Sequence, residues 1–393
     1  MKIIRTKKNL FIFLLISLFL SACRKEVDRT PLGAKKLDCL VSGNITLTNH
    51  NPNGVDYICD CDVEISSGVY TIEKNVTIEF SNGGGIRVTN SGALSANGTA
   101  AEPIIMRGSS VSQNYWLGIS FESNSTNNEL NHFQILNAGM RAIGVEVAGG
   151  TNIQDAAIAV SGRLKMSNST ISKSAGSGLV VNETGKLFGF SSNTIQQCNN
   201  FPVFMYAGQL NNTAFNTCSF SANTKNYIGI YSVSSNAEVA ETVNFVETSI
   251  PYFGLSTLSF QAPATMASGV HLTMSENSAF IVHPSSSLKI NGTAVKPVQI
   301  SGENAVAGSW RGMLVRSNST NNVFNYLIIS DGGQAELGFG TGITNLAVGE
   351  LAKAQLTLNN CESIRSAGCQ LSHSTADGTI VNNSSNITNV CTY

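Results

Sequence analysis

The sequence predicts an all-β solenoid, specifically a parallel β-helix of about 13–14 coils with roughly 23–25 residues in each coil. Three observations support this fold class. Apolar residues recur in columns at a nearly constant spacing, as they do when successive coils stack their inward positions. Short β-type segments such as "GLVV", "YIGIY" and "LIIS" are separated by Gly, Asn and Ser. Helical 3.6-residue periodicity is missing after the N-terminal segment.

The repeat is clearest in the middle of the chain, where three apolar columns share two consecutive spacings of 24 and 25 residues. A leucine-rich repeat would need a Leu and Asn framework that this chain lacks. A stacked β-coil explains the columns best. The columns are Met166/Phe190/Phe215, Ile171/Ile195/Phe220 and Leu179/Val203/Ile228.

A longer duplication overlies the coil period. The hexapeptide "SNSTNN" occurs at 123–128 and again at 317–322, an offset of 194 residues. At the same offset Trp116 recurs as Trp310 and "NGTA" recurs, and "KSAG" is followed by a related "RSAG" at an offset of 192. The chain is therefore predicted to hold a first β-helix copy at 57–250 and a second, truncated copy at 251–393, continuous with the first.

The repeated hexapeptide lies between two apolar segments in both copies. Asn tolerates left-handed backbone conformations, and Ser, Thr and Asn side chains hydrogen-bond to nearby peptide groups. Asn side chains can also stack in ladders from coil to coil. We interpret the hexapeptide as a tight corner between strands, and keep a copied ligand site as the alternative.

Several longer segments resemble exported bacterial lipoproteins with a right-handed parallel β-helix, the solenoid fold of pectate lyases. They include "VYTIEKNVTIEF", "GALSANGTAAEPIIM", "WLGISF" and "NELNHFQILNAG", together with their partners in the second copy. The resemblance covers about residues 55–393. It implies the fold and leaves the function open, because this fold is known in adhesins, glycan lyases, glycan hydrolases and inert scaffolds.

The N-terminus predicts export and a lipid anchor. A basic start, a short apolar run and small residues form a secretory signal over residues 1–22. Leu20-Ser21-Ala22-Cys23 resembles the bacterial lipobox, which implies lipidation of Cys23. The alternative is a plain signal peptide with an incidental cysteine. Residues 23–38 are expected to form a lipid-anchored tether and residues 39–56 an N-terminal cap.

Charge restricts the partners. The sequence has 24 basic and 25 acidic residues, and the signal removes four of the basic ones, which leaves 20 − 25 = −5. A negative chain is a poor partner for nucleic acid or for an anionic membrane surface. The expected membrane contact is through the lipid alone. Arg24 follows the lipid cysteine where an inner-membrane retention signal would have aspartate, so the outer membrane is the expected location, with its periplasmic or surface side left open.

Eight cysteines remain besides Cys23. Because Cys369 and Cys391 would nearly stack on successive coils, they are the best disulfide candidate, and exported proteins can keep disulfides. Cys39 paired with Cys59 or Cys61 would staple the predicted cap. A zinc site at Cys59 and Cys61 would need further ligands, so no metal or cofactor is predicted.

Carboxylates are scarce in the middle of the chain, where glycan hydrolysis would require a defined pair. Glu129 and Asp155 are 26 residues apart and could meet on neighbouring coils. Asp60 and Asp62 would share a strand face, but two oxygen donors are too few for calcium. No nucleophile constellation is found, so the chain is interpreted as a non-enzyme, and no catalytic residue is predicted.

The predicted function is a non-enzymatic adhesion or glycan-binding scaffold of the cell envelope. Tyr115, Trp116 and Trp310 are the candidate glycan contacts, since aromatic rings can stack on sugars, although the recurrence of both tryptophans favours packing. Two alternatives remain open. One is a polysaccharide lyase or glycoside hydrolase that acts on an extended glycan, and the other is a passive spacer or assembly subunit with a protein partner.

Overall fold

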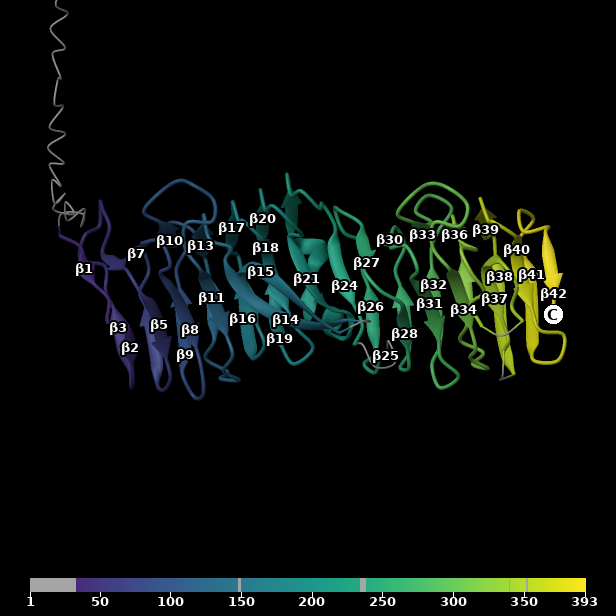
Figure 1. Cartoon of the computed structure of the whole chain (residues 1–393), viewed down its shortest axis with the longest axis horizontal. Helices are drawn as coiled ribbons and strands as arrows, with labels where there is room; N and C mark the ends of the chain where they lie inside the picture. The colour runs from purple at the N-terminus through teal and green to yellow at the C-terminus, as the bar shows by residue number, and fades with distance from the viewer. Residues whose placement is uncertain (1–32, 148–149, 234–237, 339, 351–352) are drawn as a thin grey trace, which may run out of the picture.

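The computed structural model describes residues 33–147, 150–233, 238–338, 340–350 and 353–393. The predicted signal, Cys23 and most of the predicted tether lie outside these residues. The chain forms one long rod whose coils follow each other in sequence order from end to end (Figure 1). Among the described residues, the strand pairs are parallel except for β14 (Arg141–Val147) with β15 (Gly150–Val160). The prediction of an all-β parallel β-helix is confirmed.

The first half of the rod has three sheets, which we name A, B and C. Sheet A contains β1 (Lys35–Lys36), β4 (Tyr57–Cys59), β7 (Thr77–Phe80), β10 (Ile104–Gly108), β13 (Phe133–Leu136), β17 (Thr170–Ser172), β20 (Thr194–Gln196) and β23 (Ser219–Ser221). Sheet C contains β3 (Ile45–Leu47), β6 (Val69–Ile72), β9 (Ala93–Asn97), β12 (Glu129–Asn131), β16 (Arg163–Ser167), β19 (Lys186–Ser191) and β22 (Thr213–Ala214).

Sheet B is the one sheet of the described chain that continues through both halves. Besides β14 and β15, it contains β2 (Leu40–Val41), β5 (Asp62–Ile65), β8 (Gly85–Val88), β11 (Gly118–Phe121), β18 (Ser177–Val181), β21 (Val203–Tyr206), β24 (Ile228–Tyr231), β27 (Tyr252–Gly254), β30 (His271–Met274), β33 (Val298–Gly302), β36 (Leu327–Ser330) and β39 (Glu362–Ile364).

Two new sheets accompany sheet B in the second half. Sheet D contains β25 (Glu238–Val239), β28 (Leu258–Phe260), β31 (Ala279–Val282), β34 (Gly312–Val315), β37 (Thr344–Val348), β40 (Cys369–His373) and β42 (Val390–Thr392). Sheet E contains β26 (Val243–Phe245), β29 (Ala264–Met266), β32 (Leu288–Asn291), β35 (Val323–Asn325), β38 (Ala354–Asn359) and β41 (Gly378–Asn383). Two 3₁₀ helices, η1 (Ala207–Asn212) and η2 (Phe215–Thr217), lie at the junction, and Asn211 of η1 accepts a 2.7 Å hydrogen bond from the Asn244 N–H of β26.

The apolar columns of the sequence form the core. Ile171 pairs with Ile195 and Ile195 with Phe220, and the column Leu179, Val203 and Ile228 is paired in the same way. Strands alternate inward and outward residues because successive side chains point to opposite faces of a sheet. The result is a continuous apolar core inside the rod.

Corners between strands use residues that accept a left-handed backbone. Asn75, Asn137 and Asn168 have positive φ, as do the equivalent residues His132 and Tyr326. Asn enters this region at low cost because its short polar side chain hydrogen-bonds locally. His132 lies at such a corner, between β12 and β13.

Corresponding strands of the two copies lie in different sheets. Strands β10, β11 and β12 of the first copy have 5, 4 and 3 residues, and their counterparts β33, β34 and β35 have the same lengths. The first set lies in sheets A, B and C, whereas the second lies in sheets B, D and E. Sheet B therefore contains the second strand of this coil in the first copy (β11) and the first strand of the equivalent coil in the second copy (β33).

Strands form in both of the described N-terminal segments that precede the expected first copy. Strand β1 lies within the predicted tether, and β2 and β3 lie within the predicted cap. These strands pair with β4, β5 and β6, so the first coil already follows the pattern of the rod.

Candidate functional site: the outer face of sheet B

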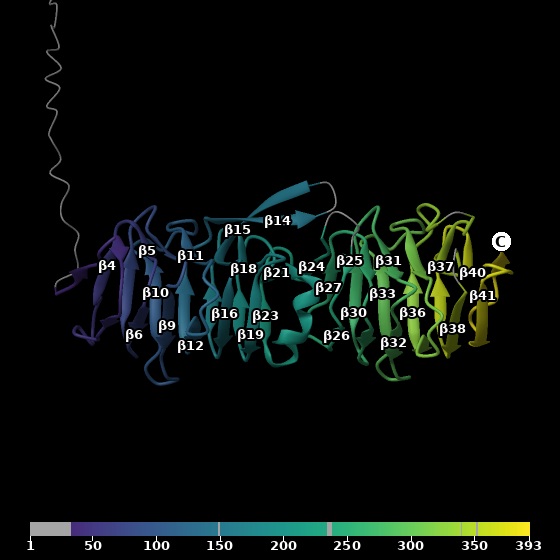
Figure 2. The ribbon, with the colours of Figure 1, turned by 90° about the horizontal axis from the view of Figure 1, so that it is seen from below.

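The outer face of sheet B has three stretches of different chemistry. The N-terminal stretch is polar, the middle stretch is apolar and covered by a β-hairpin, and the C-terminal stretch contains a pocket. Figure 2 shows the hairpin of β14 and β15 lying outside the body of the rod. Because one sheet carries all three stretches, a long ligand could contact more than one of them.

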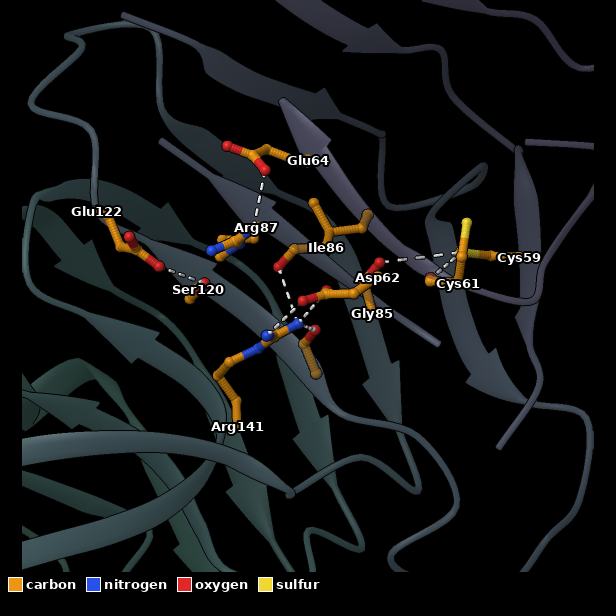
Figure 3. Close-up of polar contacts among 11 residues, drawn as sticks. Cys59, Cys61, Asp62, Glu64, Gly85, Ile86, Arg87, Ser120, Glu122 and Arg141 are labelled. Atoms are coloured by element: carbon orange, nitrogen blue, oxygen red, sulfur yellow. Dashed lines mark hydrogen bonds and ion pairs between the residues drawn. The ribbon is translucent and has the colours of Figure 1, made fainter. Parts of the chain in front are cut away.

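The polar stretch is built from outward residues of β5, β8 and β11 (Figure 3). Glu64 accepts a 2.8 Å hydrogen bond from Arg87, the residue next to it on the adjacent strand. Ser120 follows Arg87 one strand further along and donates to Glu122 at 3.2 Å. The Nε atom of Arg87 is buried without a hydrogen-bond partner among the described residues.

Arg141 joins this stretch from the base of the hairpin. Its Nη1 and Nη2 atoms lie 3.0 and 2.6 Å from the two carboxylate oxygens of Asp62, and Nη2 also lies 3.3 Å from the Gly118 carbonyl oxygen. A Cβ atom on Gly85 would lie 2.4 Å from Nη2. Glycine at position 85 therefore leaves the space through which the guanidinium reaches Asp62.

The hairpin covers the middle stretch. Its Val145 is buried, as are the sheet B residues Phe204 and Tyr231 in the same apolar cluster. Glu183 fixes the hairpin, because its carboxylate accepts 3.2 Å and 3.3 Å hydrogen bonds from the Tyr231 hydroxyl and the Glu146 N–H. Burial raises the pKa of Tyr231 far above its ordinary value, and the Glu183 carboxylate adds to this effect. The hydroxyl therefore stays protonated as a donor.

A pocket of about 330 Å³ follows beyond the aromatic residues. This volume is at the lower end of the range of roughly 300–1,000 Å³ for small-molecule sites. The pocket is lined by Tyr227, His271, Thr273, Gln299, Ile300, Ser301, Gly302, Glu303, Ala305, Ile328, Ser330, Asp331, Ile364 and Arg365.

One wall of the pocket is a fixed ion pair. Arg365 donates to both carboxylate oxygens of the buried Asp331, at 2.5 and 3.2 Å, and the Ser330 hydroxyl donates to Asp331 at 2.7 Å. The hydrogen bond with Asp331 raises the pKa of Arg365. Burial lowers the pKa of His271 below its ordinary value of 6.5, so its imidazole is neutral at neutral pH.

The other pocket carboxylate belongs to Glu303, which is exposed. The part of the chain that the structure describes supplies no hydrogen bond or ion pair to this carboxylate. Glu303 and Asp331 come from adjacent coils, the arrangement that would favour a glycan-cleaving enzyme. However, the oxygens of Asp331 are already held by Arg365 and Ser330. The pocket can therefore donate hydrogen bonds to a polar ligand and accept them from it.

The sequence-based carboxylate pair is separated by the fold. Glu129 lies on β12 of sheet C and forms a 2.8 Å ion pair with Lys165. Asp155 lies on β15 of sheet B, opposite Ala142 of the hairpin. The 26-residue spacing does not bring them together, because β14 and the first part of β15 form a hairpin between them. Asp155 therefore lies on a different sheet from Glu129.

The repeated hexapeptide forms the same corner in both copies. The side chain of Asn128 accepts a 3.1 Å hydrogen bond from the Leu94 N–H and donates a 3.0 Å bond to the Ser123 carbonyl. Asn322 makes the equivalent bonds, 2.9 Å from the Leu288 N–H and 3.0 Å to the carbonyl oxygen of the first serine in its own hexapeptide. These Asn and Ser side chains are buried, which supports the structural interpretation.

Two of the three aromatic residues expected from sequence as glycan contacts are buried, and the third, Tyr115, packs over Gly108 of sheet A. Trp116 and Trp310 are both 0% exposed, and their indole N–H groups donate to the Leu136 and Ser330 carbonyls at 2.8 and 2.7 Å. The two tryptophans therefore pack inside their copies. Tyr115 is half-buried, with its hydroxyl 3.2 Å from Ser109.

The described part of the chain contains two disulfides, Cys369–Cys391 and Cys39–Cys61. The prediction of disulfides is thus confirmed. Cys59, which the sequence left as an alternative partner for Cys39, is instead a free buried thiol. It lies on β4 as part of the apolar core and is 0% exposed.

In comparisons with known proteins, no family model, no curated protein and no solved structure matches the chain. Within the described ranges, no helix has the length and apolar character needed to cross a membrane. The pocket residues Tyr227, Gln299 and Arg365 were missed by sequence reasoning. A comparison of outward positions between the two copies could have found Gln299, which corresponds to Ile105, whereas Tyr227 has no counterpart in the truncated second copy.

Proposed function

We propose that this chain is a lipid-anchored protein of the cell envelope that binds an extended glycan along the outer face of sheet B without cleaving it. The lipobox-like residues before Cys23 and the signal-like N-terminus support the anchor and export. The outer membrane is the proposed location. The rod then displays its long face at a distance from the membrane.

The observation that carries the binding function is the pocket beside Tyr227. Sugars need hydrogen-bonding groups for their hydroxyls together with an apolar surface for their C–H faces. Gln299, Ser301 and Thr273 offer the first, and Tyr227 and Ile328 offer the second. A pocket with a few convergent polar groups on a partly apolar lining is a typical small-molecule site.

Occupied carboxylates argue against cleavage. Asp62, Glu64 and Asp331 are held by Arg141, Arg87 and Arg365 respectively. A glycoside hydrolase needs two carboxyl groups directed at one glycosidic bond. In the pocket, only Glu303 could approach a substrate without first leaving an arginine.

Size-exclusion chromatography with light scattering tests this function on a soluble form that begins at Arg24. The probes are a neutral β-glucan, a galactomannan and polygalacturonate. Co-elution at unchanged glycan mass supports binding, whereas a falling glycan mass would establish the enzyme alternative. Binding should weaken in Gln299→Ala and persist in Gln134→Ala, a matched change on the outer face of sheet A. If no probe co-elutes, the proposal fails and the spacer with a protein partner replaces it.

A further inference from the structure

The two copies provide an internal comparison for the pocket. In the first copy, Arg107 forms a 2.9 Å ion pair with Glu79 on the neighbouring strand, and this pair lies across the outer face of sheet A. At the offset of 194 the same two positions are Ser301 and Thr273, which face each other on β33 and β30. The second copy has two short hydroxyl side chains where the first has two long charged ones.

A second difference concerns the loop that follows β10 and β33. In the first copy the ring of Tyr115 packs over Gly108, where an added Cβ would lie 2.8 Å from the ring. The equivalent of Gly108 is Gly302, which lines the pocket. The equivalent of Tyr115 is Ser309, whose hydroxyl accepts a 2.9 Å hydrogen bond from the Asn304 N–H. The aromatic side chain that covers this face in copy one is missing in copy two.

A third position changes in the same direction. Leu136 of the first copy corresponds to Ser330, which lines the pocket and donates its hydroxyl to Asp331. One position carries a larger side chain in the second copy, since Thr77 corresponds to His271. His271 is the first residue of β30 and is half-buried. Taken together, an aromatic ring, an isobutyl group and an ion pair of the first copy are replaced by four short hydroxyl side chains. Thr273, Ser301 and Ser330 line the hollow, and Ser309 lies next to Gly302 of its lining.

We propose that this hollow is a subsite for a single neutral sugar unit, a proposal that rests on the glycan-binding function. Its short hydroxyl groups and the Gln299 amide can both donate and accept hydrogen bonds, which suits sugar hydroxyls. The charged groups that line it are Glu303, Asp331 and Arg365. Arg365 is already paired with Asp331, so no cation is left for the carboxylate of a uronic acid, and Glu303 would repel it.

Variants that restore the first copy test the subsite. Ser309→Tyr should cover the hollow, and the double variant Thr273→Glu with Ser301→Arg should rebuild the ion pair across it. Binding of neutral gluco- and manno-oligosaccharides and of oligogalacturonates is measured by titration calorimetry, with circular dichroism as a check on folding. The matched control is Tyr115→Ser, which makes the reverse change in the first copy.

We expect wild type to bind a neutral oligosaccharide, each restoring variant to lose at least tenfold in affinity, and Tyr115→Ser to bind like wild type. If a glycan binds and neither folded variant changes its affinity, the subsite is wrong while the glycan-binding function stands. Preference for oligogalacturonate would overturn the neutral-sugar assignment. If wild type binds no probe in either experiment, both proposals fall together.

Discussion

Arg141 and Asp62 are 79 positions apart in sequence, yet two nitrogens of one guanidinium lie 3.0 and 2.6 Å from the two oxygens of one carboxylate. The contact crosses β8 and β11, and Nη2 also reaches the Ile86 and Gly118 carbonyls at 3.4 and 3.3 Å. The pair ties the base of the hairpin to the second coil. The Arg141 side chain is 10% exposed, so its charge depends on Asp62 for compensation.

Asp62→Ala is predicted to destabilise the N-terminal half of the rod. Removing one partner of a buried ion pair costs about 3–5 kcal/mol, and because the Asp62 side chain is 32% exposed we expect the lower figure of roughly 1–3 kcal/mol. Urea unfolding followed by the fluorescence of the buried Trp116 and Trp310 measures the loss.

Asp60→Ala is the matched control for this change. Asp60 forms an ion pair with Lys36 in which both side chains are well exposed, so its loss should cost less than about 1 kcal/mol. Limited proteolysis within the hairpin should increase in Asp62→Ala and stay at the wild-type rate in Asp60→Ala. Equal effects of the two variants would show that Arg141 does not depend on Asp62.

The hexapeptide corners predict a contrast between neighbouring asparagines. Asn128→Ala or Asn322→Ala should cost about 1–3 kcal/mol each, because each change leaves a buried leucine N–H without a partner and removes a hydrogen bond to a serine carbonyl. The adjacent Asn127 and Asn321 are exposed, and their replacement by Ala should change stability by less than about 0.5 kcal/mol.

Urea unfolding measures both pairs of variants, and the same samples are used for glycan titration. The structural interpretation requires unchanged glycan affinity in all four folded variants. A loss of affinity in Asn127→Ala and Asn321→Ala at full stability would instead identify the hexapeptide as a ligand site.

Sequence reasoning predicted the solenoid because its core depends on one property that sequence shows directly. Inward residues such as Ile171 and Ile195 must be apolar, and they stack in register at nearly constant spacing. Some corners are also visible, since Asn and Gly adopt a left-handed backbone at lower cost than other residues, whereas corners such as those at His132 and Tyr326 carry no such signal. These local requirements fix the coil without knowledge of what lies outside it.

The outer face could not be predicted in the same way. Residues 141–147 alternate like an ordinary coil strand, and the pattern does not reveal that β14 pairs with β15 rather than with the next coil. Asp331 and Arg365 are 34 positions apart, which exceeds the coil period because loops lengthen these coils. Their contact depends on loop length and corner geometry, so a fixed spacing does not find it.

Buried thiols give a prediction of pH dependence. Burial raises the pKa of the Cys59 thiol from 9.0 to about 11, and burial raises that of Cys198 to about 12. In the unfolded chain these thiols ionise near pH 9. Their contribution to stability is therefore complete below pH 9 and is lost as the pH rises through 11 and 12. Unfolding midpoints measured between pH 7 and 11.5 should fall in the upper part of this range.

Thiol labelling provides the check. The soluble form has four free buried cysteines and two disulfides among its described residues, so iodoacetamide at pH 8 should label the native protein slowly and label four thiols in urea. Cys198→Ala should reduce the count to three and weaken the alkaline loss of stability. Rapid labelling of the native protein at pH 8 would show that these thiols are accessible and that burial does not protect them.

The lipid anchor is tested by Cys23→Ser. We expect wild type to incorporate a labelled fatty acid and to sediment with membranes, and we expect Cys23→Ser to lose both properties. Without the lipid, the eleven-residue apolar run of the signal is too short to hold the chain in a bilayer, because a spanning helix needs roughly 20 residues. The mature charge of 20 − 25 = −5 gives little attraction to an anionic surface, so the unlipidated chain should be released even at low salt.

Cys218→Ala, a change at a buried free cysteine, should leave labelling intact. Wild type that is exported without label would establish the plain signal peptide and remove the anchor from the proposed function.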